Sequence, residues 1–514
     1  MSKKIISSIL ALVLLLSLLA ATACGTTTNP NETKKPDDPT KQSETIDPSS
    51  ETETDKGEDR IKSTIPETYD FGNEVISIAG WDPGVWAGMA RAIRDVISTG
   101  PNGDLINDAV FDRNCMVEDN YKVKFEYDSI AYVDLMNQIK NNNLTDTHVW
   151  DITYPLMEVL GQLVTAGVFT NLFDVPNMDF SKPWYDQSAI SYLSVAGGYD
   201  SGGVLFAVPT AASINDKDAT AALAFNLQSA ADNNLPDLYT KVKDNDWTFE
   251  ELYTLCDGIY TDLNSNDKAD AEDFYGFLGK HDVAPSFKDG AGSLIITKDD
   301  EGFYEFTLGS SRDVEVAEAI LDFMDQDFFF NHHTAGIDDD QFTKMFANGQ
   351  GLFFWMRMDE VTNLRSSATD FGILPIPKYE RTQDYFQSYV SKNTCGILSI
   401  PLTCTGDRLF MTGMIIEALA SDSLYTLQPK YIDEALGTKY ARDEDSREMI
   451  KLIMAHRVFD PGMIYQFAGF GNTYLYLKDQ NVNLTTLVAR NKSAVDSAVE
   501  KFNEDIVKLI NSMS

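Results

Sequence analysis

A short polar run, residues 261–273, carries oxygen-bearing side chains at regular spacing. They stand at every second residue and then once more three residues later: Asp262, Asn264, Asn266, Lys268, Asp270 and Asp273. Calcium takes six to eight oxygen ligands, and this spacing wraps short carboxylates and amides around one point, with Lys268 offering its backbone carbonyl. The pattern predicts a calcium-binding loop.

Two residues depart from the usual pattern of such a loop. Asp267 stands where glycine is usual, although aspartate tolerates the left-handed backbone conformation. Asp273 stands where glutamate is usual, and its shorter side chain binds less readily through both oxygens. The alternative interpretation is a polar turn between a helix and the strand that begins near Phe274.

Catalytic motifs are absent from the sequence. It contains no H-E-x-x-H, G-x-S-x-G or G-x-x-x-x-G-K-[ST] pattern. The whole sequence has only five histidines, which makes zinc chemistry an unfavoured interpretation. The one cluster among them, His332-His333, is typical of a polar turn. We therefore expect no enzymatic activity. Two alternatives stay open: a secreted hydrolase that attacks carbohydrates with two carboxylates, and a surface receptor or adhesin without a transport role.

Charge and cysteine content narrow the possible partners. The formal net charge of -38 argues strongly against nucleic-acid binding, because no net positive field exists to replace phosphate counterions. Cys115 and Cys256 lie on apolar faces of expected helices and should be buried. Cys395 and Cys404 flank one apolar segment and could either pair or remain free.

The N-terminus has the order of a secretory signal. Lys3 and Lys4 precede an apolar run and four small residues, after which Cys24 follows. The run Ala21-Thr22-Ala23-Cys24 resembles a bacterial lipobox, although Ala21 replaces the usual leucine. We expect residues 1–23 to be a signal peptide and 24–68 to be a lipidated cysteine with a disordered, polar tether. Ordinary secretion and an uncleaved anchor are the alternatives.

The remainder, from Tyr69 to Ser514, is longer than one hydrophobic core normally serves, so we expect two lobes. We assign residues 69–209 and 391–435 to the first lobe and residues 210–390 and 436–514 to the second. Strand patterns alternate with helix patterns, which predicts an α/β fold with a mostly parallel sheet flanked by helices in each lobe. Ligands of such sheets bind beyond the carboxyl ends of the strands.

Individual elements follow from apolar periodicity and capping. Strands are expected at 75–78, 121–127, 148–153, 221–225, 352–356 and 371–376, and a loop at 81–86. Helices are expected from about Gly103, at 132–139, 155–166, 314–324 and 340–347, and after Thr248. The segment 389–400 should return to the first lobe, and helices should dominate 407–514.

The order of signal, Cys24, polar tether, two lobes and helical C-terminus resembles that of the extracellular solute-binding proteins of carbohydrate ABC importers. Three local runs, in their order along the chain, add to this resemblance. The run 149–155, VWDITYP, is followed by GVFTNL at 167–172. The run 346–355, FANGQGLFFW, resembles a helix, turn and strand that bring a tryptophan to a cleft, and FGILPIP at 371–377 resembles the next strand. The resemblance spans nearly the whole body.

The resemblance implies a periplasmic-binding-protein-like clamshell with a helical C-terminus, closing over a small solute, and the solute we expect is an oligosaccharide. It also implies a monomer on the outer face of the cell membrane, held there only by its lipid, with importer permease subunits as partners. A bound Ca²⁺ would be structural. Aromatic faces would stack on sugar rings. The expected ligand-binding residues are Trp81, Asp82, Trp86, Tyr154 and Trp355, followed by Trp184, Tyr389 and Tyr465.

Overall fold

A computed structural model describes residues 60–82, 95–364, 369–432 and 444–513. The chain divides into Met1–Asp59 and a compact unit, Arg60–Ser514. The predicted signal peptide, Cys24 and Trp86 lie outside the described residues. No described helix combines the length and apolar character that crossing a membrane requires. At the start of the compact unit, Ser63 donates a hydrogen bond to Glu417.

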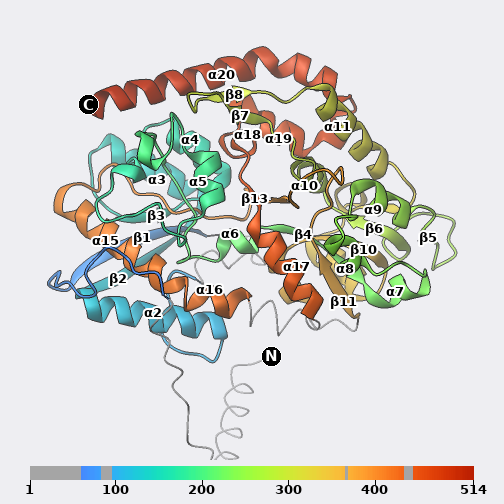
Figure 1. Cartoon of the computed structure of the whole chain (residues 1–514), viewed down its shortest axis with the longest axis horizontal. Coiled ribbons are helices and arrows are strands. Elements are labelled where there is room, and N and C mark those ends of the chain that lie inside the picture. The colour runs from blue at the N-terminus through green and yellow to red at the C-terminus, as the bar shows by residue number, and fades with distance from the viewer. Residues whose placement is uncertain (1–59, 83–94, 365–368, 433–443, 514) are drawn as a thin grey trace, which may run out of the picture. The chain divides into compact units, whose positions relative to one another are not determined.

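The first sheet has three parallel strands in the order β2-β1-β3 (Figure 1). They are β1 (Glu74–Asp82), β2 (Val123–Ala131) and β3 (Ile152–Tyr154). The expected parallel arrangement with intervening helices is confirmed here. The associated helices are α2 (Leu105–Tyr121), α3 (Tyr132–Leu144), the 3-10 turn η2 (Met157–Val159), α4 (Leu160–Val164), α5 (Gln187–Leu193) and α15 (Gly406–Ser423).

The second sheet has six strands in the order β11-β4-β10-β6-β5, with β9 paired to β6. The strands are β4 (Ala221–Asn226), β5 (Tyr260–Thr261), β6 (Phe274–Gly279), β9 (Phe329–Asn331), β10 (Gly351–Arg357) and β11 (Phe371–Leu374). This sheet is mixed, because β4 runs antiparallel to both of its neighbours. The flanking helices include α7 (Leu227–Asp232), α8 (Leu238–Lys243), α9 (Phe249–Cys256), α10 (Val283–Gly290), α11 (Ser311–Met324), α13 (Asp339–Ala347) and α17 (Glu444–Ala455).

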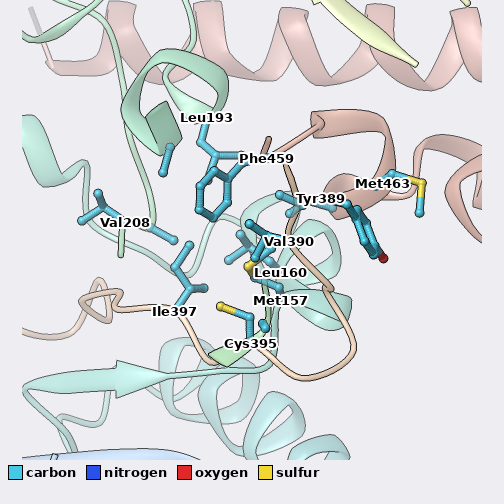
Figure 2. Close-up of a cluster of buried hydrophobic side chains, with 14 of the residues drawn as sticks. Met157, Leu160, Leu193, Val208, Tyr389, Val390, Cys395, Ile397, Phe459 and Met463 are labelled. Carbon is cyan, nitrogen blue, oxygen red and sulfur yellow. The ribbon is translucent and has the colours of Figure 1, made fainter. Parts of the chain in front are cut away.

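Crossing segments join the two sheets through a shared core. The segment after β12 (Ser388–Tyr389) returns to the first sheet, where the Thr153 amide donates to the Ser399 carbonyl at 2.9 Å, as the sequence predicted. β12 itself pairs with β13 (Arg457–Val458). Figure 2 shows the apolar cluster at this junction, where Leu160 lies with residues of the crossing segments and of the C-terminal part.

The C-terminal part is helical, as expected: α18 (Pro461–Tyr465), α19 (Phe470–Leu475) and α20 (Leu484–Met513). In Figure 1, α20 runs along the top from the side of α11 to the side of α4. It packs on a hairpin of β7 (Ile296–Lys298) and β8 (Tyr304–Phe306). The described cysteines Cys115, Cys256, Cys395 and Cys404 are free, so Cys395 and Cys404 do not form the disulfide that was considered.

Candidate functional site

A cavity of about 810 Å³ lies at the carboxyl ends of the first lobe's strands. Tyr132 opens α3 directly after β2, and Glu158 lies in η2, shortly after β3. The facing wall comes from the turn after α18 and from the second half of α20. Such clefts at strand ends are the usual ligand sites of open α/β sheets. Aromatic and polar lining residues are Tyr132, Glu158, Gln162, Thr165, Tyr465, Gln466, Phe467, Asn472, Lys501, Phe502 and Asp505.

The turn that forms one wall has an unusual backbone. Gln466 and Ala468 both adopt the left-handed conformation, with φ of 56° and 49°. Non-glycine residues rarely adopt it, and when they do the surrounding structure must hold them there. The Gln466 side chain does so in part, because its Oε1 accepts from the Asn472 amide at 3.0 Å and its Nε2 donates to the Met463 carbonyl at 3.1 Å.

The wall also depends on a glycine of the first lobe. A Cβ on Gly161 in α4 would lie 2.3 Å from the carbonyl oxygen of Tyr465, so only glycine permits this approach of the two backbones. Behind the wall, the rings of Tyr465, Phe467 and Phe502 form a cluster with centroid separations of 5.2 to 5.9 Å. The wall is therefore rigidly supported.

Charges near the cavity are mostly paired. Lys392 Nζ lies 3.8 Å from Glu158 Oε1, and the Glu158 amide donates to the Lys392 carbonyl. Burial lowers the pKa of Lys392, an effect that the nearby Glu158 opposes. Burial raises the pKa of Tyr465, so its hydroxyl stays neutral at physiological pH, and this hydroxyl shares a hydrogen bond with Tyr304. The site thus offers aromatic surface together with hydrogen-bonding groups.

Of the expected ligand-binding residues that the structure describes, only Tyr465 lines this cavity. Asp82 ends β1 and accepts a hydrogen bond from Ser129 at 2.8 Å. The expectation of a loop from Trp81 to Trp86 is wrong for Trp81 and Asp82, because β1 continues to Asp82 by pairing with β2. Six expected aromatic residues, Tyr465 among them, have side chains buried in the core: Trp81, Tyr154, Trp184, Trp355, Tyr389 and Tyr465.

Sequence reasoning missed most of the cavity's lining. Tyr132 and Glu158 come soon after predicted strands, so the rule that ligands bind at the carboxyl ends of strands could have identified them. No local signal marks Phe467 or Phe502, because they reach the cavity only through long-range packing: Phe467 lies in the turn after α18, and Phe502 lies in α20.

The predicted calcium loop forms a compact polar turn. Asp267 has φ of 58°, so the left-handed conformation expected at this position is present. Asp262 accepts from the amides of Asn266 and Asp267. Asp273 is fully buried and accepts from the Leu263 amide at 3.1 Å and the Tyr260 hydroxyl at 3.0 Å. Both carboxylate oxygens of Asp273 are therefore used in hydrogen bonds that hold the loop together.

A second cluster of possible metal donors lies elsewhere. His148, Asp151 and Cys404 form the one group in the described part of the chain whose donor atoms already converge, within 4.8 Å of one another. However, Arg408 Nε donates to Asp151 at 3.0 Å and the Ser77 amide donates at 2.8 Å. These donors satisfy the carboxylate, so the cluster is explained as a structural network.

Comparison with known proteins defines the fold. No family model and no curated protein matches the sequence. UspC of M. tuberculosis superimposes with a TM-score of 0.51 at 12% identity, covering 82% of this chain and 100% of UspC. The cyclic alpha-maltosyl-1,6-maltose binding protein of Arthrobacter globiformis gives 0.52 at 12%, covering 84% and 100%. The maltose-binding periplasmic protein MalE of Listeria monocytogenes, in complex with maltose, gives 0.50 at 13%, covering 85% and 98%.

These similarities confirm the expected fold class. The chain has a periplasmic-binding-protein-like α/β fold with a helical C-terminus. At 12–13% identity the likeness concerns the fold and leaves the solute open.

Proposed function

We propose that this protein is the solute-binding component of an ABC importer and captures a small solute, an oligosaccharide, in the 810 Å³ cavity. The observation that carries the proposal is the position of this cavity in a periplasmic-binding-protein-like fold. It lies at the carboxyl ends of β2 and β3, where Tyr132, Tyr465 and Phe467 meet polar side chains.

The chemistry of the lining supports a saccharide. A sugar ring has an apolar face, which suits an aromatic side chain, and a rim of hydroxyls, which suits carboxylates and amides such as Glu158, Gln466 and Asn472. The volume falls within the range of small-molecule sites. Two of the similar structures named above are described as binders of maltose or of a cyclic maltosyl-maltose.

The test is isothermal titration of the protein with maltotriose, cellotriose, xylotriose and mannotriose, followed by chromatography of each mixture after prolonged incubation. Binding without products supports the proposal. Cleaved products would instead establish the hydrolase alternative. Binding without compaction in small-angle scattering would favour a receptor that does not close.

Replacement of Tyr132 tests the cavity itself. Tyr132 is half-buried at the start of α3, so Tyr132→Ala should leave the fold intact. If its ring stacks on the solute, the dissociation constant should rise about tenfold, which corresponds to roughly 1.4 kcal/mol. Tyr385→Ala is the matched control, because Tyr385 is 56% exposed and lies outside the cavity. Equal affinity of both variants would contradict this location of the site.

We also propose that Cys24 is lipidated and holds the protein on the outer face of the membrane. The support is the signal-like order of residues before Cys24. Cys24→Ser should release the protein into the medium of cells that produce it, whereas the parent chain should fractionate with membranes. Mass spectrometry of the parent chain should detect a diacylglyceryl group; a membrane-bound protein without it would contradict the assignment.

For the loop 262–273 we propose a bound structural Ca²⁺, held by Asp262, Asn264, Asn266, Asp270 and the Lys268 carbonyl. The support is the oxygen-rich spacing and the left-handed Asp267. Chelation should lower the melting temperature by several degrees, and calcium should restore it. Asp262→Asn together with Asp270→Asn should abolish the response. A parent protein that holds no calcium after dialysis against micromolar ion would contradict the proposal.

A further inference from the structure

The β7–β8 hairpin belongs to the second lobe by sequence but contacts the first. It connects α10 and α11, whose rings Phe287 and Phe323 pack together at 5.7 Å beside the second sheet. Its turn, however, reaches α5 and the segment after it, which pack in the first lobe. Figure 1 shows the hairpin beneath α20, between the two sheets.

Four hydrogen bonds, at three hairpin residues, join the hairpin to the first lobe. The Ala196 amide donates to the Gly302 carbonyl at 3.0 Å. The Tyr304 hydroxyl donates to the Tyr192 carbonyl at 3.0 Å. Lys298 Nζ donates to Ser194 Oγ at 3.1 Å and also to the Ser191 carbonyl. The contacts come from the first strand, the turn and the second strand, so the whole hairpin is docked.

The hairpin turn docks closely on the first lobe. A Cβ on Gly302 would lie 2.6 Å from the Gly197 backbone nitrogen, so the turn fits against the first lobe without space for a side chain. Burial lowers the pKa of Lys298 to about 8, which means that placing its ammonium group here costs free energy. A contact of this kind can form and separate more easily than an extended apolar interface.

The hairpin also touches the cavity wall. The Tyr304 ring stacks on Phe502 at 5.6 Å and lies 5.8 Å from Tyr465. Asn503 of α20 donates to the Tyr304 carbonyl at 2.9 Å. Tyr304 therefore contacts two lining residues of the cavity with its ring and the first lobe with its hydroxyl.

We propose that the β7–β8 hairpin is an interlobe latch that holds the two lobes in the arrangement described here and must detach from 191–197 before the lobes can separate and widen the solute cavity. The role of the cavity rests on the proposed function, but the latch itself can be tested without a solute. Detachment requires loss of the four hydrogen bonds above, whereas the hairpin keeps its packing on α20 and moves with the second lobe.

The test measures the distance between the lobes by double electron–electron resonance. Nitroxides are placed at Leu144→Cys, 81% exposed in the first lobe, and Asp340→Cys, 73% exposed in the second, in the full chain with Cys24 and Cys115 replaced by serine. The parent should give one dominant distance. Gly302→Val, which clashes with the first lobe, and Lys298→Met, which loses two hydrogen bonds, should each add a second distance population.

Gly258→Val is the matched control. Gly258 has φ of +72°, close to the +83° of Gly302, but no atom lies within 4 Å of its added Cβ. It therefore reproduces the backbone strain without the interlobe clash and should keep the parent distance. The latch is refuted if folded Gly302→Val and Lys298→Met both retain the parent distance, or if Gly258→Val shifts it equally. Failure to bind maltotriose would instead refute the proposed function and leave the distance result intact.

Discussion

Trp355→Ala should lower the free energy of unfolding by about 3–5 kcal/mol, one of the largest losses expected for a single substitution here. Trp355 lies in β10 with its side chain fully buried, and its Nε1 donates to Ser286 Oγ at 2.9 Å. Truncation leaves a large cavity between the second sheet and α10. Urea denaturation followed by tryptophan-independent far-UV circular dichroism measures the change.

Trp355→Phe is the informative control. It keeps most of the buried volume, and the Ser286 hydroxyl still donates to the Asp282 carbonyl at 2.7 Å, so the loss should be clearly smaller. If Trp355→Ala left the denaturation midpoint unchanged but weakened binding of a saccharide, the tryptophan would have the ligand-stacking role predicted from the sequence.

Arg457→Ala should also lower the free energy of unfolding by about 3–5 kcal/mol, because it breaks a buried ion-pair network. Arg457 bridges Asp186, which caps α5 in the first lobe, and Asp216 in the crossing segment, with its Nη1 2.5 Å from Asp216 Oδ2. Burial alone would raise the pKa of Asp216, but Lys217 and Arg457 outweigh burial and lower it. Without the arginine, Asp186 loses its buried positive partner.

The matched control for Arg457 is an exposed pair. Lys344 and Asp340 have side chains 64% and 73% exposed, so Lys344→Ala should leave the urea midpoint within experimental error. Asp186→Asn combined with Arg457→Met should recover part of the loss, since no unpaired charge then remains. An Arg457→Ala protein as stable as its parent would show that water solvates the site.

Local patterns predicted much of the fold. The apolar face after Thr248 predicted α9. The Thr248 hydroxyl accepts a hydrogen bond from the Glu251 amide at 3.3 Å, as the side chain of a helix N-cap should. Alternation in the run 121–127 located β2. The pairing of Tyr389 with Val458 in β12 and β13 could not be predicted, because each strand has two residues and the partners are far apart in sequence.

The candidate site was harder to predict for a physical reason. The sequence indicated large aromatic residues near strand ends, but a strand such as β10, with all seven residues buried, has apolar side chains on both faces. Its tryptophan therefore belongs to the core. The residues that line the cavity come instead from helix starts and from the C-terminal helices, whose positions depend on long-range packing.

Gly161 sets the distance between two walls of the cavity. Because the missing side chain at this position sets how near the segment around Tyr465 approaches α4, each added carbon would act as a spacer between the two walls. A series from glycine through alanine to valine would then widen the binding space in steps, and the preferred chain length of the captured solute should increase along the series. If the solute binds in this cavity, the size of residue 161, which itself lines the cavity, would help to set which solutes the protein accepts.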